Sequence, residues 1–392
     1  MRRVFSVELS NGKDLYGELE LPASTYQLLD MLEQLNMKSG DLPEWEIGEY
    51  HCFELLAPFL DSEINLYELN ALCQKLGDLD DLQSAAFDGL LQMEINKREG
   101  HIGIDKLMSL VQNVDCCHVV DEALNDSQLG RFYAENGFIP EVEKVPDEIF
   151  ELLDFELLGG KMRRGEGGVF TRKGYVVPHS GITQIPYTMP QPPQKPDYSF
   201  RLILNNYPFE NEETHEWHNV RLSLPATEEE IAAALVQLGN PPWSGVVFGV
   251  EDSAIPELLD DVDCFDGLEQ FNRLAIMVKR LEETGQLMKY KAVLQATGCT
   301  DLSMAEELAG RLDEYILDSS SRSVEDVALG ELHTMMDKAS VETLLPHLKL
   351  YSYGLDIMRH DNSELTAYGL VERGDGQPLQ AQQPNRGGME MM

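Results

Sequence analysis

The sequence has few basic side chains, and two long stretches have none at all. There are 30 Lys and Arg against 69 Asp and Glu over 392 residues, which gives a formal net charge of -39. No Lys or Arg occurs from Ser39 to Gln74, which holds eight acids, or from Leu222 to Asn272, which holds eleven. Net charge keeps many ordinary proteins soluble, but two base-free stretches indicate a function. Such a surface excludes nucleic acid and anionic membranes as partners and attracts a basic protein.

Long apolar runs and paired cysteine motifs are also missing. The start, MRRVFSVELSNG, alternates like a strand and gives no signal peptide or membrane span, so we expect a cytoplasmic protein. The six cysteines form no CxxC pair, and Cys116 and Cys117, followed by His118, have no further ligands at a recognisable spacing. We therefore predict no metal site and no cofactor, and expect buried thiols.

Catalytic motifs are incomplete. His215 and His218 lie in HEWH, which lacks the i, i+4 spacing of HExxH. The run RGEGGVF at 164–170 lacks the Lys-Ser/Thr ending of a phosphate loop, so a glycine hairpin is the preferred interpretation. No catalytic residue is predicted, and we do not expect an enzyme.

The chain contains an internal duplication. LPASTYQLLDMLEQL at 21–35 matches LPATEEEIAAALVQL at 224–238 at six of fifteen positions, and further short matches follow at an offset of about two hundred residues. Both segments predict a helix that begins with a capping box, formed by Ser24 with Gln27 and by Thr227 with Glu230. The alternating LYGELEL and HNVRLSL before them predict strands.

The predicted fold class is α+β, an array of small α/β modules in two repeats. In the first repeat we expect strands and a capped helix, a helical middle over about 66–120, a helix near 129–136 and a hairpin near 169–177. Six prolines between 178 and 197 predict an extended, semi-rigid linker. The expected boundaries are 1–177 for the first repeat (about 1–62, 63–125 and 126–177 as sub-domains), 178–197 for the Pro-rich linker, 198–373 for the second repeat and 374–392 for a disordered tail.

An ordered set of segments resembles the ArdA-type antirestriction proteins of plasmids and conjugative elements. The segments are LPATEEEIAAAL at 224–235, WEIGEYHCF at 45–53, LGRFYAENGFIP at 129–140, LLDFELLGGKM at 152–162 and GGVFTRKGYV at 167–176. The resemblance implies an elongated protein with three small α/β domains per unit, whose carboxylates imitate the phosphates of B-form DNA. It implies an inhibitor that occupies the DNA groove of Type I restriction-modification enzymes.

This chain departs from the family in two ways. Family members usually have one repeat's length and pair as dimers, so a homodimer and an intrachain pseudo-dimer both stay open here. The second repeat lacks a clear counterpart of GEYHCF and reads SGVVFGVEDSAIPELLDD after Trp243. The second repeat therefore either recognises a different surface or extends the mimic.

The candidate partner-binding residues are the acids in and near the base-free stretches. Duplex DNA carries one charge per ~1.7 Å of axis, so 39 net charges correspond to roughly 66 Å, or about 20 base pairs. The candidates are Glu44, Glu46, Glu49, Glu54, Asp61, Glu63 and Glu68 in repeat one, and Glu228, Glu229, Glu230, Glu251, Asp252, Glu257, Asp260, Asp261, Asp263, Asp266 and Glu269 in repeat two.

The competing function is an acidic scaffold or adaptor, or an inhibitor of another DNA-binding defence protein. A scaffold predicts acidic patches around an apolar hot spot, whereas mimicry predicts a stripe of carboxylates with little apolar surface. A local basic cluster interrupts the acidity, and either forms a solvated turn or contacts the acidic surface of the other repeat or of a second chain. Its members are Lys161, Arg163, Arg164, Arg172 and Lys173.

Overall fold

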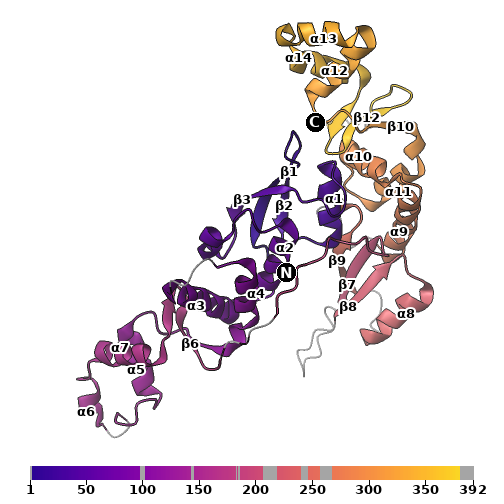
Figure 1. The fold of residues 1–392 in the computed structure, drawn as a ribbon. Coiled ribbons are helices and arrows are strands. Elements are labelled where there is room, and N and C mark those ends of the chain that lie inside the picture. The colour runs from indigo at the N-terminus through magenta and orange to yellow at the C-terminus, as the bar shows by residue number, and fades with distance from the viewer. Residues whose placement is uncertain are drawn as a thin grey trace, which may run out of the picture. The chain divides into compact units, whose positions relative to one another are not determined.

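The protein has a mixed α/β fold with small three-stranded antiparallel sheets. The computed structural model describes residues 2–97, 102–142, 145–181, 183, 186–205, 219–239, 246–256 and 267–379 (Figure 1). Contacts divide the chain into two compact units, unit 1 with Met1–Ala23 and Leu42–Pro192, and unit 2 with Ser24–Asp41 and Pro193–Met392. Within the described ranges, no helix combines the length and the apolar character that crossing a membrane requires.

Unit 1 begins with a sheet in the order β2-β1-β3, formed by β1 (Phe5–Ser10), β2 (Tyr16–Leu21) and β3 (Glu44–Tyr50). The predicted strand at 15–21 is thus confirmed. Successive side chains of a strand point to opposite faces. On β1 the residues Val7 and Leu9 are buried, whereas Glu8 between them is exposed. One face of the sheet is therefore core, and the other faces solvent.

The middle of unit 1 is helical, as the sequence predicts. It contains the 3-10 helix η1 (Glu54–Phe59), then α2 (Leu66–Gly77), α3 (Asp81–Lys97), α4 (Ile104–Gln112) and η2 (Val114–Cys116). A second sheet, in the order β4-β6-β5, packs on α3 and comprises β4 (Cys117–Val120), β5 (Val169–Thr171) and β6 (Gly174–Pro178). The predicted hairpin is β5–β6. RGEGGVF is not a hairpin, because its first three residues end α7 and Gly167 caps that helix in the left-handed conformation.

Three helices complete unit 1: α5 (Asp126–Glu135), α6 (Asp147–Phe150) and α7 (Phe155–Glu166). Glycines let α5 and α7 approach closely. A Cβ on Gly130 would lie 1.9 Å from the carbonyl oxygen of Phe155, and one on Gly159 would lie 1.8 Å from that of Asp126. The backbones thus touch where any side chain would separate them.

Unit 2 also begins with a three-stranded sheet. This sheet, β8-β7-β9, comprises β7 (Phe200–Asn205), β8 (Asn219–Leu224) and β9 (Val247–Ser253), and α8 (Glu228–Gln237) follows β8. Then come α9 (Leu268–Glu283), α10 (Leu287–Thr297), α11 (Leu302–Gly310), η5 (Leu312–Glu314), α12 (Val324–Met335), α13 (Lys338–Leu344), η6 (Leu345–His347) and α14 (Leu350–Asp361). A sheet in the order β10-β12-β11 contains β10 (Tyr315–Asp318), β11 (Glu364–Thr366) and β12 (Gly369–Arg373).

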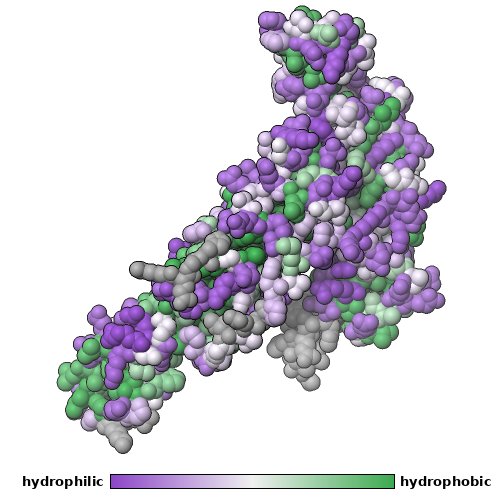
Figure 2. Space-filling view, in the orientation of Figure 1, coloured by the Kyte–Doolittle hydropathy of each residue, from purple (hydrophilic) through white to green (hydrophobic). Residues whose placement is uncertain are grey.

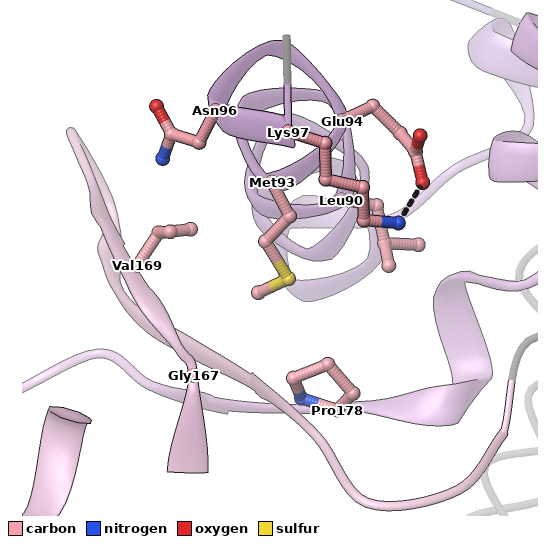
Figure 3. A pocket seen from close by; sticks show the side chains of 8 residues that line it. All are labelled: Leu90, Met93, Glu94, Asn96, Lys97, Gly167, Val169 and Pro178. Atoms are coloured by element: carbon pink, nitrogen blue, oxygen red, sulfur yellow. Dashed lines mark hydrogen bonds and ion pairs between the residues drawn. The ribbon is translucent and has the colours of Figure 1, made fainter. Parts of the chain in front are cut away.

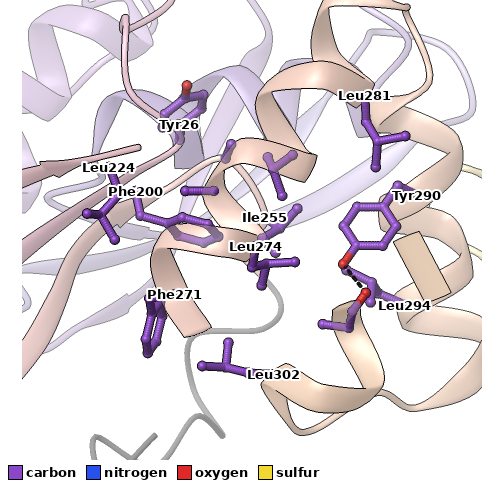
Figure 4. Packing of buried hydrophobic residues seen from close by; sticks show 14 of the residues in the cluster. Tyr26, Phe200, Leu224, Ile255, Phe271, Leu274, Leu281, Tyr290, Leu294 and Leu302 are labelled. Carbon is purple, nitrogen blue, oxygen red and sulfur yellow. Dashed lines mark hydrogen bonds between the residues drawn. The ribbon is translucent and has the colours of Figure 1, made fainter. Parts of the chain in front are cut away.

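A continuous apolar core joins the first sheet of unit 2 to α9, α10, α11 and the strands β10 and β12. Phe200 of β7 packs edge to face on Phe271 of α9, with ring centroids 5.9 Å apart (Figure 4). Tyr290 of α10 is fully buried, and its hydroxyl donates to the carbonyl oxygen of Ala305 at 2.8 Å. The core extends past the predicted start of the tail, because Leu379 packs into it. The remainder of that tail, 380–392, lies outside the described residues.

The helix α1 (Thr25–Gln34) lies between β2 and β3 in the sequence but belongs to unit 2. Both predicted capping boxes are present, at Ser24 with Gln27 on α1 and at Thr227 with Glu230 on α8. Residues 186–196 of the Pro-rich segment form neither helix nor strand.

Candidate functional site: a carboxylate array

Six glutamates gather on the solvent face of the β2-β1-β3 sheet. Five of them alternate with residues of the opposite face, because strand side chains have a period of two. A register shift in the pairing of β1 with β3 places the sixth, Glu49, opposite Ser6. All are exposed except the half-buried Glu20. We call this set the carboxylate array: Glu18 and Glu20 on β2, Glu8 on β1, and Glu44, Glu46 and Glu49 on β3.

The strand register arranges the array in rows. Glu8 lies opposite Glu18 on one side and Glu46 on the other. In the next row Ser6 lies opposite Glu20 and Glu49. Directly opposed residues have Cβ atoms about 4.5–5.5 Å apart, and successive rows on one face lie about 7 Å apart.

The array is largely uncompensated. The Ser6 hydroxyl donates to Glu18 at 2.6 Å, and His51 lies with Nε2 2.9 Å from Glu20 and Nδ1 3.8 Å from Glu49. Among the described side chains, no Lys or Arg forms an ion pair with the six glutamates. Like charges directly opposed across strands destabilise a sheet. The arrangement therefore costs folding stability, which favours a functional reason for it.

The first sheet of unit 2 provides an internal comparison, because it has the same strand order. The register also shifts at the same place in both sheets, between the second and third residues of the central strand. Its exposed face carries almost none of the acids. The residues at the positions of Glu8, Glu18, Glu20, Glu44, Glu46 and Glu49 are Ile203, Arg221, Ser223, Val247, Gly249 and Asp252. The backbone is shared, whereas the charge pattern is specific to unit 1.

The structure separates the predicted acids of repeat one into groups. Glu44, Glu46 and Glu49 belong to the array. Glu54 lies on η1, 3.8 Å from Arg172, and the backbone N–H of Glu63 donates to Asp61 at 2.9 Å. Glu68 does not belong to an exposed surface.

Glu68 is 4% exposed and instead completes the α2 capping box. Its carboxylate accepts from the Asn65 backbone at 3.0 Å and from the Tyr187 hydroxyl at 2.6 Å. A Glu three residues after an N-cap residue is typical of a capping box. The spacing of Asn65 and Glu68 therefore predicts that this carboxylate bonds the helix start.

In repeat two the predicted acids also divide. Glu228 and Glu229 are exposed on the first turn of α8, and Glu269 is exposed on the first turn of α9. The remaining candidates, Glu257, Asp260, Asp261, Asp263 and Asp266, lie outside the described residues.

Three other acids of repeat two have partners within the fold. Glu230 accepts from the Thr227 backbone at 2.7 Å, and Glu251 pairs with Arg221 at 2.8 Å. Asp252 is 5% exposed and accepts from the Tyr198 hydroxyl at 2.8 Å. Contrary to expectation, Asp252 is therefore an interior hydrogen-bonding residue, not a surface charge.

Sequence reasoning missed Glu8, Glu18 and Glu20. The signal was available, since LYGELEL places acids at alternate positions of a predicted strand. These glutamates lie outside the base-free stretch that begins at Ser39. Arg2 and Arg3 precede Glu8 in the sequence, and Lys13 lies between Glu8 and Glu18. Linear charge counting cannot show that β1 brings them beside β3.

Three of the five residues of the basic cluster contact acids of their own unit. Arg163 donates two hydrogen bonds to Asp126, at 2.8 and 2.9 Å, and thereby lowers the pKa of that carboxyl. Lys173 lies 3.4 Å from Asp81. Together with the pairing of Arg172 and Glu54, these contacts tie the β5–β6 hairpin and α7 to the rest of unit 1.

A groove of about 380 Å³ lies between α3 and the β5–β6 hairpin (Figure 3). Its one carboxylate, Glu94, pairs with Lys97 at 2.6 Å and with Lys106 at 3.2 Å. The described lining contains no Ser, Thr, Cys or His. The lining residues are Leu90, Met93, Glu94, Asn96, Lys97, Gly167, Val169 and Pro178.

The thiols do not form a metal centre in the described part of the chain, where no group of three or more His, Cys, Asp or Glu is placed to hold an ion. Cys73 is buried, whereas Cys52, Cys116, Cys117 and Cys299 are half-buried, so the expectation of buried thiols holds fully only for Cys73. Cys264 and the HEWH segment lie outside the described residues.

An apolar patch covers the α5–α7 end of unit 1 (Figure 2). Phe138, Ile149, Leu152 and Leu157 are 57%, 51%, 80% and 66% exposed. Patches of contiguous apolar side chains often mark interaction surfaces.

Comparison with protein families and with characterised proteins finds no family model and no curated protein that matches this chain.

Proposed function

We propose that the protein is a DNA-mimicking antirestriction protein that binds and blocks the DNA-binding groove of a Type I restriction-modification enzyme. The observation that carries the proposal is the carboxylate array. Six glutamates share one exposed sheet face, with Glu8 opposite two other acids, at a cost to stability. The ArdA-like segments supply the identity of the target class.

The charge density of the array is close to that of DNA. Its three rows span about 14 Å along the strands and hold six carboxylates. A duplex of about that length carries roughly eight phosphates on all its sides. A basic groove that neutralises phosphates would find a comparable charge on this face, already fixed by the sheet.

The proposal also includes the arrangement that the resemblance implies, with two ArdA-like repeats joined by the Pro-rich segment and small modules in an elongated array. It gives the two repeats unequal roles. Because unit 2 has Ile203, Val247 and Gly249 where unit 1 has glutamates, we assign groove binding to unit 1.

Competition with DNA tests the proposal. A fluorescent duplex carrying the recognition site is bound to a Type I methyltransferase core, and the protein is titrated in at several salt concentrations. Displacement should be competitive and should weaken as salt rises, because phosphate mimicry depends on electrostatics. The array variant changes all six glutamates to Gln and should lose displacement.

A matched control changes six exposed acids of unit 2, Glu to Gln and Asp to Asn, so that net charge shifts equally. This control should retain displacement if unit 1 carries the site. Equal losses in both variants would show that only net charge matters, and no displacement by the wild type at low salt would refute the proposal. The control residues are Glu283, Asp313, Glu325, Glu342, Asp361 and Glu364.

The α5–α7 apolar patch favours a second candidate, an acidic adaptor or an inhibitor of another DNA-binding defence protein. Adaptor interfaces have apolar hot spots, and Leu152 and Leu157 are exposed as such residues would be. Substituting both by Ser should abolish partner capture in the adaptor case and leave DNA displacement unchanged in the mimic case.

A further inference from the structure

The helix α1 is packed in a unit to which its neighbours in the chain do not belong. The strands β2 and β3 on either side of it form the unit 1 sheet, whereas Ser24–Asp41 belongs to unit 2. Its polar contacts in unit 2 are numerous and specific. We call the receiving residues, Tyr198, Asp252, Lys291 and Tyr368, the α1 site.

A buried charge cluster holds the middle of α1. Lys291 on α10 donates to both Asp30 and Glu33, and the side chains of Lys291 and Asp30 are 5% and 7% exposed. Burial lowers the pKa of Lys291, but Asp30 and Glu33 raise it above its ordinary value overall, so the ammonium stays charged. The Tyr368 hydroxyl donates to the same Asp30 at 2.9 Å.

A second set of contacts holds the start of α1. The Ser24 hydroxyl donates to Asp252 at 2.6 Å, and the Tyr26 hydroxyl donates to the carbonyl oxygen of Tyr198. The rings of Tyr26 and Tyr198 pack edge to face with centroids 5.8 Å apart. Positions 26, 30 and 33 lie on one face of a helix, so one stripe of α1 carries the recognition.

This stripe distinguishes α1 from its counterpart in the second repeat. In the aligned segments 21–35 and 224–238, the positions of Tyr26, Asp30 and Glu33 correspond to Glu229, Ala233 and Val236 of α8. Val236 is 61% exposed, and Ala234 is the buried residue of α8. The helix α8 therefore lacks the three side chains with which α1 contacts the α1 site.

The connection between α1 and its site is a tether. The chain from β3 to the rest of unit 2 passes through residues 186–196, which form neither helix nor strand. Contacts formed across such a tether are governed by effective concentration, which the length and stiffness of the linker set. Domain swapping exchanges an identical element between two copies of a chain, and the same contacts then form between molecules.

We propose that the α1 site also receives α1 of a second copy of this chain, so that two molecules form a dimer by exchanging this helix. At low concentration the tethered helix wins, and the monomer prevails. The exchange is independent of the carboxylate array.

Charge reversal tests the exchange. One variant carries Lys291→Glu, and the other carries Asp30→Lys with Glu33→Lys. Alone, each variant opposes like charges at its own α1 site. Mixed, each helix meets a site of opposite charge on the other molecule, so native mass spectrometry should show a heterodimer at least about 10-fold above either homodimer.

The triple variant, with all three substitutions in one chain, controls for the contact itself and should be a monomer. A monomeric triple variant beside a mixture that forms no heterodimer would overturn the proposal. If the charge-reversed chains do not fold, an experiment on the wild-type chain tests the exchange instead. Isotope-labelled and unlabelled wild-type chains, refolded together at rising concentration, should give a mixed-mass dimer, and its absence would overturn the exchange.

Shortening the tether provides an independent measurement. Deleting residues 188–192 removes about 16 Å of reach and retains Tyr187 and Pro193, which anchor the segment through Glu68 and Ser39. The dimer fraction should rise in light scattering. An unchanged monomer at every concentration would contradict the proposal.

Discussion

Replacing Glu8 by Gln should stabilise the first sheet, although it removes a charge proposed to act in function. Glu8 lies opposite Glu18 and Glu46, so the substitution removes two like-charged pairs. Each directly opposed pair is worth about 0.2–1 kcal/mol. The expected gain in the free energy of local opening is therefore about 0.4–2 kcal/mol at low salt.

Amide hydrogen exchange over the unit 1 sheet measures this gain directly. A gain of that size slows exchange about 2- to 30-fold at low salt. At 1 M salt the Debye length falls to ~3 Å, which is shorter than the spacing of the pairs, so the difference between variant and wild type should nearly vanish. The same substitution should weaken displacement of DNA from the target.

Glu364→Gln is the matched control. Glu364 is an exposed strand residue of β11, and Val371 lies opposite it. Its removal changes net charge equally but breaks no like-charged pair, so exchange in its sheet should not slow. Faster or unchanged exchange in the Glu8 variant at low salt, or the same gain at 1 M salt, would refute the electrostatic reasoning.

Further substitutions test the packing at three places in the fold. Burial raises the pKa of Asp88 to about 6, and no described donor reaches its Oδ1. Because the folded state disfavours the charged carboxylate, wild type should lose about 1–2 kcal/mol of stability from pH 4 to pH 7 relative to Asp88→Asn. Thermal unfolding measures this loss. Gly159→Ala should lower the free energy of unfolding by about 1–3 kcal/mol, because its Cβ would lie 1.8 Å from a backbone oxygen. Gly165→Ala on the same helix meets open space and should raise the free energy of unfolding, measured in urea, by up to about 1 kcal/mol. Lys291→Ala should cost about 3–5 kcal/mol in urea unfolding and regain part of that loss when Asp30→Asn and Glu33→Gln are added; no recovery would contradict the ion-pair account.

Local patterns predicted much of the fold. The capping boxes at Ser24 and Thr227 located the starts of α1 and α8, because a cap depends on four consecutive residues. Alternation predicted β2 and β8, and the helical middle and the β5–β6 hairpin followed from the same kind of pattern. These features depend on neighbours in the sequence, which is why one sequence suffices.

The site was only partly predictable, since burial and register depend on distant residues. Asp252 is interior because Tyr198 and Ser24 converge on it, and Ser24 lies 228 positions away. Glu8 joins Glu46 only once β1 and β3 pair. Composition showed that the chain is acidic, whereas pairing decided which carboxylates share a face.

The placement of α1 has a consequence for synthesis on the ribosome. Tyr368 contacts Asp30 across 338 positions of sequence. At roughly 5–20 residues per second, the nascent helix waits about 17–70 s for that partner. Tyr26 waits a shorter time, because Tyr198 follows it by 172 positions. Cotranslational chaperones would therefore meet this segment early, and codon usage between the two repeats would set how long they hold it.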